Sequence, residues 1–192
     1  MKLYTIILFP IWIFLFGACA DNSHYTGASK DIKADSAITA NNDPLPHTNA
    51  EINTGSVNPL ELVHYAEGLM GIPYKYGSIN PDEGFDCSGF ITYVFNNFGV
   101  SVPRSSRDFT DVERKINIRE AKPGDLILFT GTDSTIREVG HMGIITDNNG
   151  LEISFIHSTS GKAYGVTKTP LNKYYQGRFV KAIRIFKSND IK

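Results

Sequence analysis

The pattern of hydrophobic positions predicts two helices near the middle of the chain. After Cys87 the apolar residues recur about every 3.6 positions, the spacing of one helix face, until Gly99 ends the segment; they are Phe90, Ile91, Val94, Phe95 and Phe98. An earlier helix is predicted to begin at the capping residue Asn58, with Pro59 in its first turn, and to end at Gly71. Both helices are expected to bury one face in a core.

After the second helix the pattern changes to short runs rich in β-branched and aromatic residues. Gly, Asn, Asp or Pro bound these runs, as expected for strands joined by turns; they span residues 126–129, 140–146, 151–157 and 179–186. Because the helices come first and the strands follow, residues 58–192 are predicted to form one α+β domain. In this domain the N-terminal helices pack on a mainly antiparallel β-sheet.

Residues 1–18 have the pattern of a secretory leader. Lys2 precedes an apolar run that is too short to span a bilayer comfortably as a permanent helix. The run ends in Gly17-Ala18-Cys19, which resembles a bacterial lipoprotein box. We therefore predict that Cys19 is acylated and anchors the protein to a membrane of the bacterial cell envelope, at the outer membrane or a periplasmic face. The alternative is an ordinary cleaved signal in which Cys19 is incidental.

Residues 19–57 are predicted to be the acylated cysteine followed by a disordered tether. From position 20 onward Asn, Ser, Thr, Ala, Asp and Pro dominate, and no helical or alternating pattern is sustained. This organisation affects the redox state of the chain, which has 2 cysteines. If Cys19 carries lipid, Cys87 has no disulfide partner. An unpaired thiol in an oxidising compartment favours a chemical role for Cys87.

The charge balance bears on two classes of partner. The chain has 19 Lys and Arg residues against 20 Asp and Glu residues, a formal net charge of −1. A near-neutral chain of this kind implies neither a surface for nucleic acid nor a surface for strongly acidic ligands. No internal repeat is found, and no feature of the sequence indicates an oligomer.

Cys87 is the candidate nucleophile because it lies where a turn becomes a helix. Unpaired backbone N–H groups carry partial positive charge at a helix start, which is expected to favour thiolate over thiol. The alternative is that Cys87 is a small buried hydrophobic residue without chemistry.

A cysteine nucleophile needs a base, and residues 58–192 contain three histidines. His64 lies in the first predicted helix and is expected to be a surface or packing residue. His141 and His157 lie in neighbouring predicted strands. A three-residue hairpin loop at 148–150 would pair Asp147 with Leu151 and place His141 directly opposite His157, on the same face of the sheet. A two- or four-residue loop would put the two rings on opposite faces.

Several motifs occur in the order found in NlpC-type cell-wall cysteine peptidases, which this chain resembles. The central ones are Asp86-Cys87-Ser88-Gly89-Phe90, Gly140-His141-Met142-Gly143-Ile144 and Ile156-His157-Ser158. Further matches, in the same order, are Pro73-Tyr74-Lys75-Tyr76-Gly77, Pro103-Arg104-Ser105-Ser106 and Pro123-Gly124-Asp125-Leu126-Ile127-Leu128-Phe129. The resemblance covers essentially all of residues 58–192. The order Cys, His, His alone is general to papain-like folds.

The resemblance implies a papain-like fold and hydrolysis of an amide bond in peptidoglycan stem peptides or muropeptides. Cys87 would attack the carbonyl group, His141 would transfer the proton and His157 would orient His141. The backbone N–H of Cys87 would help to hold the oxyanion. The cut most often made by this family lies between D-Glu and a diamino acid. The second option is a D,D-endopeptidase cut in the crosslink between diaminopimelate and D-Ala.

The resemblance also suggests roles for residues around the nucleophile. Tyr76 would reach into the cleft beside the sulfur. Asp86 and Ser88 resemble a pair that contacts the amine end of the substrate, although they are equally well explained as a helix cap and a first-turn residue. Arg104 is expected to support its loop rather than to touch substrate.

Two other classes of protein remain open. Cys87, His141 and His157 would be the ligands of a zinc site, but their spacing has no short paired-ligand motif and no metal or other cofactor is expected. Alternatively, the domain is inactive and binds cell-wall fragments. The presence of Cys87, His141 and His157 argues against loss of activity. An occluded cleft would still make the domain inactive.

Overall fold

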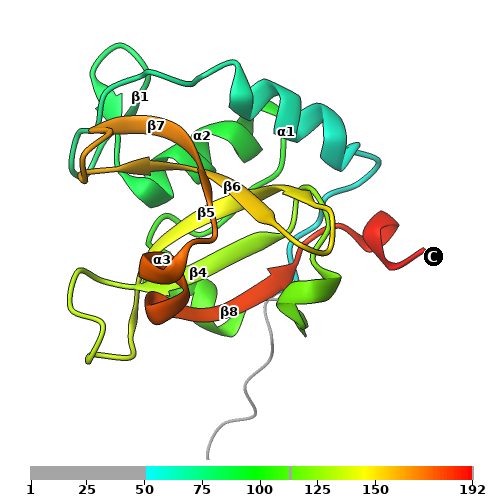
Figure 1. Cartoon of the computed structure of the whole chain (residues 1–192). Coiled ribbons are helices and arrows are strands. Elements are labelled where there is room, and N and C mark those ends of the chain that lie inside the picture. Colours follow the sequence, from blue (N-terminus) through cyan, green and yellow to red (C-terminus); the bar gives the residue numbers. More distant parts are fainter. Residues whose placement is uncertain (1–50, 113, 192) are drawn as a thin grey trace, which may run out of the picture. The chain divides into compact units, whose positions relative to one another are not determined.

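The computed structural model describes residues 51–112 and 114–191. The predicted leader, Cys19 and most of the predicted tether lie outside these residues. Helices precede most of the strands, which confirms the predicted α+β class (Figure 1). The elements are α1 Pro59–Glu67, β1 Ile79–Asn80, β2 Gly84–Phe85, α2 Cys87–Asn97, η1 Ser106–Asp111, β3 Arg114–Ile116, η2 Ile118–Glu120, β4 Leu126–Thr130, β5 Val139–Asn148, β6 Ile153–Thr159, β7 Gly165–Pro170, α3 Lys173–Arg178, β8 Phe179–Arg184 and η3 Lys187–Asp190.

Six strands form an antiparallel sheet in the order β3-β8-β4-β5-β6-β7, and β1 pairs with β2 separately. All five residues of β4 are buried, because both faces of the sheet are covered near its centre. Leu126 and Leu128 pack into the cluster that includes residues of α1 and α2. Ile127 and Phe129 point to the other face and pack with Tyr175 of α3. The strand period of two thus divides the core between two layers.

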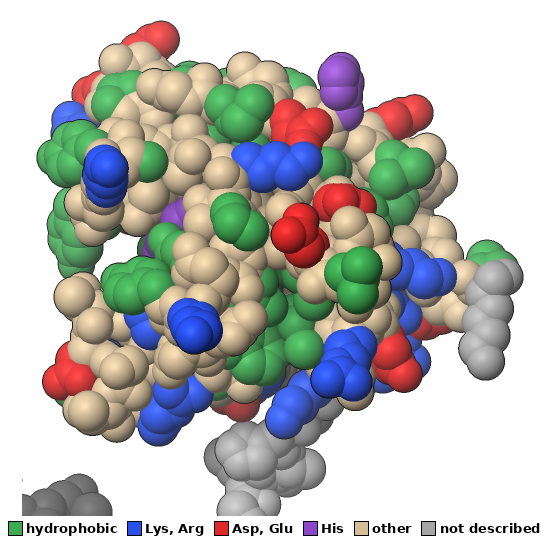
Figure 2. Space-filling view, viewed as in Figure 1, with side chains coloured by type: hydrophobic (Ala, Val, Ile, Leu, Met, Phe, Trp, Pro, Cys, Tyr) green, Lys and Arg blue, Asp and Glu red, His purple; other side chains and the backbone are tan. Residues whose placement is uncertain are grey.

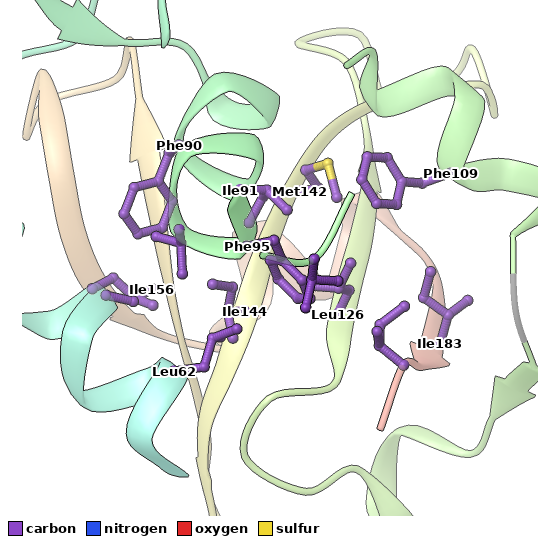
Figure 3. Packing of buried hydrophobic residues seen from close by; sticks show 14 of the residues in the cluster. Leu62, Phe90, Ile91, Phe95, Phe109, Leu126, Met142, Ile144, Ile156 and Ile183 are labelled. Atoms are coloured by element: carbon purple, nitrogen blue, oxygen red, sulfur yellow. The ribbon is translucent and has the colours of Figure 1, made fainter. Parts of the chain in front are cut away.

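Helix α2 packs its apolar face on the sheet, as the helical spacing predicted. Phe90, Ile91, Val94 and Phe95 are each 0% exposed. Figure 3 shows Ile91 between α2 and the strands, close to Met142 of β5. Burying several large apolar side chains is the main stabilising contribution to this layer. The start of α2, with Cys87, is therefore held rigidly against β5.

Helix α1 begins as predicted but ends early. The side chain of Asn58 accepts a hydrogen bond from the backbone N–H of Leu60 at 2.9 Å, and Pro59 occupies the first turn. The helix ends at Glu67 rather than next to Gly71. Beyond Gly68 the backbone N–H groups of Leu69 and Met70 bond to carbonyl groups three residues back, so the chain forms tight turns instead of a further α-helical turn. The N–H of Gly71 donates instead to the carbonyl oxygen of Val166 on β7.

Two elements near the cleft were not predicted from sequence. Strand β7 lies at the edge of the sheet, and only two of its six residues are buried, so few of its positions need to be apolar. Helix α3 has six residues and buries only Tyr175 and Arg178. A helix this short carries too few apolar positions for a period to be detected.

The described part of the predicted tether is packed on the domain. Ile52 is 7% exposed and belongs to the core cluster on the α1 and α2 side. Glu51 forms an exposed ion pair with Lys187 of η3. Ile52 and Glu51 lie on the N-terminal side of the predicted boundary at residue 58, which stays a prediction. The packing of Ile52 could not be predicted, because a single apolar residue in a polar segment gives no periodic signal. Within residues 51–112 and 114–191 no helix is long and apolar enough to cross a membrane.

Candidate active site

Cys87 is the first residue of α2 and is partly buried. Asp86 caps the helix, since its carboxylate accepts a hydrogen bond from the backbone N–H of Gly89 at 2.6 Å and another from Gly77 at 2.9 Å. A Cβ atom on Gly89 would overlap the carbonyl oxygen of Ser78. The glycine two residues after the nucleophile thus lets the preceding loop pack closely over the first turn.

His141 and His157 contact one another across neighbouring strands. Nε2 of His141 lies 2.8 Å from Nδ1 of His157. His141 lies on β5 and His157 on β6, and both rings are close to Tyr175 of α3. The predicted placement of the two rings on one face of the sheet is confirmed. The predicted direct opposition is wrong, because the pairing of Ile144 with Ile156 puts His157 across from Gly143 and makes His141 its diagonal neighbour.

The register that produces this contact differs from the predicted one. Asn148 pairs with Ile153 and Ile144 pairs with Ile156, so the hairpin loop has four residues rather than three, and Asp147 does not pair with Leu151. A register irregularity between Ile145 and Asp147 adds one residue to β5. The longer loop would put the rings on opposite faces, and the bulge restores them to the same face.

Thr169 of β7 extends the chain of hydrogen-bonding groups. Its Oγ1 lies 3.0 Å from Nε2 of His157. If that nitrogen carries the proton and donates to Thr169, then Nδ1 of His157 accepts from Nε2–H of His141. The remaining ring nitrogen of His141, Nδ1, is then free to accept a proton. Sequence reasoning missed Thr169 because β7 itself was not predicted.

The glycine after Met142 allows the two strands to approach closely here. A Cβ atom on Gly143 would lie 2.7 Å from Cδ2 of Phe155, 2.8 Å from the carbonyl oxygen of Ile156 and 3.2 Å from Cβ of His157. A side chain at position 143 would therefore push β6 and its histidine away from β5.

Cys87 and His141 line the same cleft, whose volume is about 940 Å³. On the face drawn in Figure 2, a histidine side chain is set back beside a hollow near the left edge. Further lining residues come from the loops after β4 and β6, from β7 and from α3. His64, by contrast, is exposed on α1, as expected.

The tyrosine beside the nucleophile is Tyr74 rather than Tyr76. Tyr74 lines the cleft with Cys87, and the charge of the Cys87 sulfur contributes to a raised pKa of Tyr74, after burial. Tyr76 is 88% exposed and is not among the residues that line the cleft. The prediction for Tyr76 is corrected accordingly. Residues at positions i and i+2 of a regular extended segment would face the same side. Tyr76 instead lies in a turn, closed by a hydrogen bond from the backbone N–H of Ser78 to the carbonyl oxygen of Lys75, so the extended backbone at Tyr74 does not continue to Tyr76.

Burial and nearby charges favour the neutral forms of Cys87, His141 and His157 before substrate binds. Burial raises the pKa of the Cys87 thiol to about 11, and the charge of Asp86 adds to the rise, while backbone hydrogen bonds from Ser88, Met142 and Cys87 act in the opposite direction. The prediction that the helix start favours thiolate is therefore wrong, because burial outweighs the helix-end N–H groups. The bond from Met142 also shows that the sulfur lies against β5, next to His141.

Both imidazoles hold their protons weakly. Burial lowers the pKa of His141 well below its ordinary value, and the nearby His157 and Arg178 act in the same direction. Burial lowers the pKa of His157 to about 3, again with a contribution from Arg178. At neutral pH the site therefore holds a thiol and two neutral imidazoles.

Asp86 and Ser88 are engaged with Arg104. The guanidinium of Arg104 donates to both carboxylate oxygens of Asp86, at 2.8 and 3.1 Å, and to Oγ of Ser88 at 3.0 Å. The Asp86 side chain is 11% exposed and the Arg104 side chain 42% exposed. The expected supporting role of Arg104 fits this ion pair, and Asp86 acts as helix cap and ion-pair partner. A contact of Asp86 or Ser88 with substrate stays a prediction.

Ser158 ties the nucleophile segment to the histidine strand. Its Oγ donates a hydrogen bond of 2.7 Å to the carbonyl oxygen of Phe85, two residues before Cys87. Because Ser158 directly follows His157, this buried bond fixes the distance between β6 and the start of α2. No group of three or more His, Cys, Asp or Glu residues within 51–112 and 114–191 is arranged to hold a metal ion.

A cysteine at the start of a helix, packed against an antiparallel sheet that carries a histidine pair, defines a papain-like domain. The model of the NlpC/P60 family matches residues 71–184, and the chain belongs to that family.

Named relatives and a solved structure agree with this assignment. The chain is 33% identical over 141 residues to the γ-DL-glutamyl hydrolase of Bacillus subtilis (strain 168), covering 72% of this chain and 32% of that protein. It is 32% identical over 143 residues to the probable endopeptidase NlpC of Escherichia coli (strain K12), covering 73% of this chain and 86% of that protein. An NlpC/P60 family protein from Bacillus cereus ATCC 10987 has a TM-score of 0.60 and 25% identity, over 69% of this chain and 42% of that one. This chain spans about a third of the length of several of the curated relatives that it matches.

Proposed function

We propose that this protein is a cysteine endopeptidase that hydrolyses amide bonds in peptidoglycan stem peptides. The observation that carries the proposal is the shared cleft of Cys87 and His141, with His141 hydrogen-bonded to His157. Relatives named as endopeptidases and as a γ-DL-glutamyl hydrolase support the reaction class.

The neutral resting groups indicate how the reaction begins. The sulfur of Cys87 attacks the substrate carbonyl carbon while its proton moves to Nδ1 of His141, which the bond to His157 leaves available. Charge then appears only as the carbon–sulfur bond forms. In this proposal the backbone N–H of Cys87, at the start of α2, stabilises the negative oxygen of the intermediate.

The second half of the reaction returns the proton. Protonated His141 donates to the leaving amine, the carbon–nitrogen bond breaks and an acyl-thioester on Cys87 remains. His141 then takes a proton from a water molecule that attacks the thioester carbon. The carbon–sulfur bond breaks, His141 returns its proton to the sulfur of Cys87, and the new carboxylic acid leaves. Throughout, His157 and Thr169 hold the ring of His141 in one orientation.

For the bond that is cut, we rank the γ-D-glutamyl–diamino acid bond first. The relative named as a γ-DL-glutamyl hydrolase supports this choice. The D,D-endopeptidase cut between diaminopimelate and D-Ala is the second candidate. We also propose that the protein is lipid-anchored through Cys19 in the bacterial cell envelope, which follows from the lipoprotein-like sequence before that residue.

Incubation of the full chain with muropeptides, followed by mass spectrometry of the products, tests the activity and locates the cut. We expect Cys87→Ala to abolish cleavage. Cys19→Ala is the matched control, because it removes the other cysteine of the chain and is expected to leave cleavage in solution unchanged. Iodoacetamide should block both the parent chain and the Cys19→Ala variant.

Three outcomes would contradict the proposal. Cleavage that survives Cys87→Ala would end the cysteine-peptidase mechanism. Loss of cleavage with a chelator alone would favour a zinc site instead. Binding of muropeptides without any cleavage would favour a wall-fragment-binding protein.

A further inference from the structure

Arg178 is a buried cation in the cleft that the mechanism above does not use. It is the last residue of α3, is 9% exposed, and lines the cleft together with Cys87 and His141. Its guanidinium lies over the rings of Tyr174 and Tyr175, at 5.1 and 5.8 Å from their centroids. Burial of a charged group is costly unless an opposite charge or hydrogen bonds compensate for it.

The hydrogen bonds of Arg178 are incomplete. Nη1 donates to the hydroxyl of Tyr174 at 2.7 Å and Nη2 donates to the carbonyl oxygen of Thr130 at 2.8 Å. Nε is buried and has no hydrogen-bond partner in the part of the chain that the structure describes. A guanidinium has five N–H groups, so these two bonds leave donors unused.

Arg178 also lacks the acidic partner that comparable arginines have. Arg104 pairs with Asp86, and Arg184 pairs with the fully buried Asp125. Between residues 51 and 191, position 113 excepted, no carboxylate forms an ion pair with Arg178. A buried guanidinium with spare donors and no counter-ion is prepared for a bidentate anion such as a carboxylate.

The rest of the cleft has the same sign. Its lining includes Lys162 as well as Arg178 and no Asp or Glu residue. A cleft with this charge favours an anionic occupant and disfavours a cationic one.

The position of Arg178 relative to His141 indicates which part of a substrate would meet it. The ring of Tyr175 lies against both His141, with ring centroids 6.4 Å apart, and the guanidinium of Arg178. The ion pair of Asp86 and Arg104 lies instead at the start of α2. Because His141 protonates the leaving amine, a group on its side of the cleft meets the leaving part of the substrate.

We propose that Arg178, with Tyr174, binds a carboxylate on the leaving-amine side of the scissile bond and so selects acidic peptides. This inference rests on the proposed function, since it takes the leaving amine from that reaction. Arg178 is thus a specificity-determining residue. A peptide whose leaving part is neutral or amidated binds less tightly than one whose leaving part carries a carboxylate.

Binding to the inactive Cys87→Ala chain tests the proposal without cleavage. The probes are the peptide L-Ala-γ-D-Glu-L-Lys with a free C-terminal carboxylate and the same peptide with a C-terminal carboxamide, and the readout is isothermal titration calorimetry. We expect the carboxylate form to bind roughly 10- to 100-fold more tightly, the range of a charge-assisted hydrogen-bonded pair. Adding Arg178→Gln should remove the preference and leave carboxamide binding nearly unchanged.

Two further variants separate recognition from folding. Arg137→Gln is the matched control, because Arg137 donates to the carbonyl oxygen of Gly177 in the same segment but does not line the cleft; it should retain the preference. Arg178→Lys keeps the charge but not the fork, and should retain a reduced preference. Arg178→Lys also replaces Arg178→Gln as the test variant if circular dichroism shows that Arg178→Gln does not fold.

Equal affinity of the Cys87→Ala chain for the two probes, or binding of neither, would overturn the proposal. So would a preference that persists unchanged in Arg178→Gln, or in Arg178→Lys if Arg178→Gln does not fold. Failure of the proposed function looks different. A chain with active Cys87 would then cleave neither probe, while the inactive chain still prefers the carboxylate.

Discussion

Both ring nitrogens of His157 have a partner, which ties its protonation state to the fold. Nδ1 contacts Nε2 of His141 and Nε2 contacts Oγ1 of Thr169, while burial keeps the ring from taking up a second proton. A protonated His157 would have donors on both nitrogens, and its Nδ1 would no longer accept from His141. The neutral state is therefore needed for the geometry of the proposed base.

The lowered pKa of His157 should make the stability of the fold depend on pH. The folded-state pKa of His157 is about 3, below its value in an unfolded chain. Between pH 6.5 and 3 the unfolded chain binds more protons, so the free energy of unfolding falls as pH falls, by up to about 1.4 kcal/mol per pH unit for each such group. His157→Gln, whose amide keeps one donor and one acceptor, should flatten this dependence.

Urea denaturation at several pH values between 7.5 and 4 measures the effect. His64→Gln is the matched control, because His64 is exposed on α1, and it should leave the pH dependence as in the parent chain. If His157→Gln and the parent lose stability equally over this range, His157 is not held neutral by burial.

At the scale of elements, the cleft depends on how β5, β6 and the start of α2 are held together. The bulge between Ile145 and Asp147 sets which face carries the histidines, and Gly143 allows β6 to lie close. Ser158 then joins β6 to the carbonyl oxygen of Phe85 just before α2. The histidine pair is therefore positioned by strand geometry as much as by its own hydrogen bond.

Gly143→Ala should separate strand geometry from chemistry. The added methyl group would meet Cδ2 of Phe155 and the carbonyl oxygen of Ile156, so β6 must shift. We expect a stability loss of about 1–3 kcal/mol and a fall in kcat/KM on muropeptides of roughly 100-fold, since displacement of about 1 Å is enough for such a loss. Gly177→Ala, where a Cβ meets no atom within 4 Å, is the control. Equal activity of the two variants would show that close approach of β5 and β6 is not required.

The elements also show what sequence reasoning could supply. The stripe of Phe90 and its neighbours predicted α2, since a long helix repeats its signal several times. The same-face placement of the histidines was predicted from a wrong register. A bulge depends on the packing of two strands and gives no periodic signal in the sequence. The longer loop and the bulge each reverse the face on which the histidines lie, so the two errors in the predicted register cancel.

At the scale of the whole molecule, the residues that were missed come from segments with little apolar content. Thr169 lies on the edge strand β7 and Arg178 on the six-residue helix α3. Both reach the cleft only because the chain returns to the sheet after β6, which the local pattern does not reveal. The nucleophile and the histidine pair, by contrast, follow from motifs that are local in sequence, although the burial that sets their pKa values is a property of the assembled fold.

The N-terminal limit of the packed domain can be tested at Ile52. Ile52 is 7% exposed within the core that α1 and α2 cover, so the packed region extends to the N-terminal side of Asn58. Ile52→Ala in the full chain should lower the free energy of unfolding by about 2–4 kcal/mol, through lost burial and the cavity left behind. Glu51→Ala is the neighbouring control, because its ion pair with Lys187 is exposed and should contribute less than about 1 kcal/mol. Denaturant unfolding measures both. A loss for Ile52→Ala no larger than that for Glu51→Ala would mean that the domain begins near residue 58, as the polar composition of the preceding segment predicted.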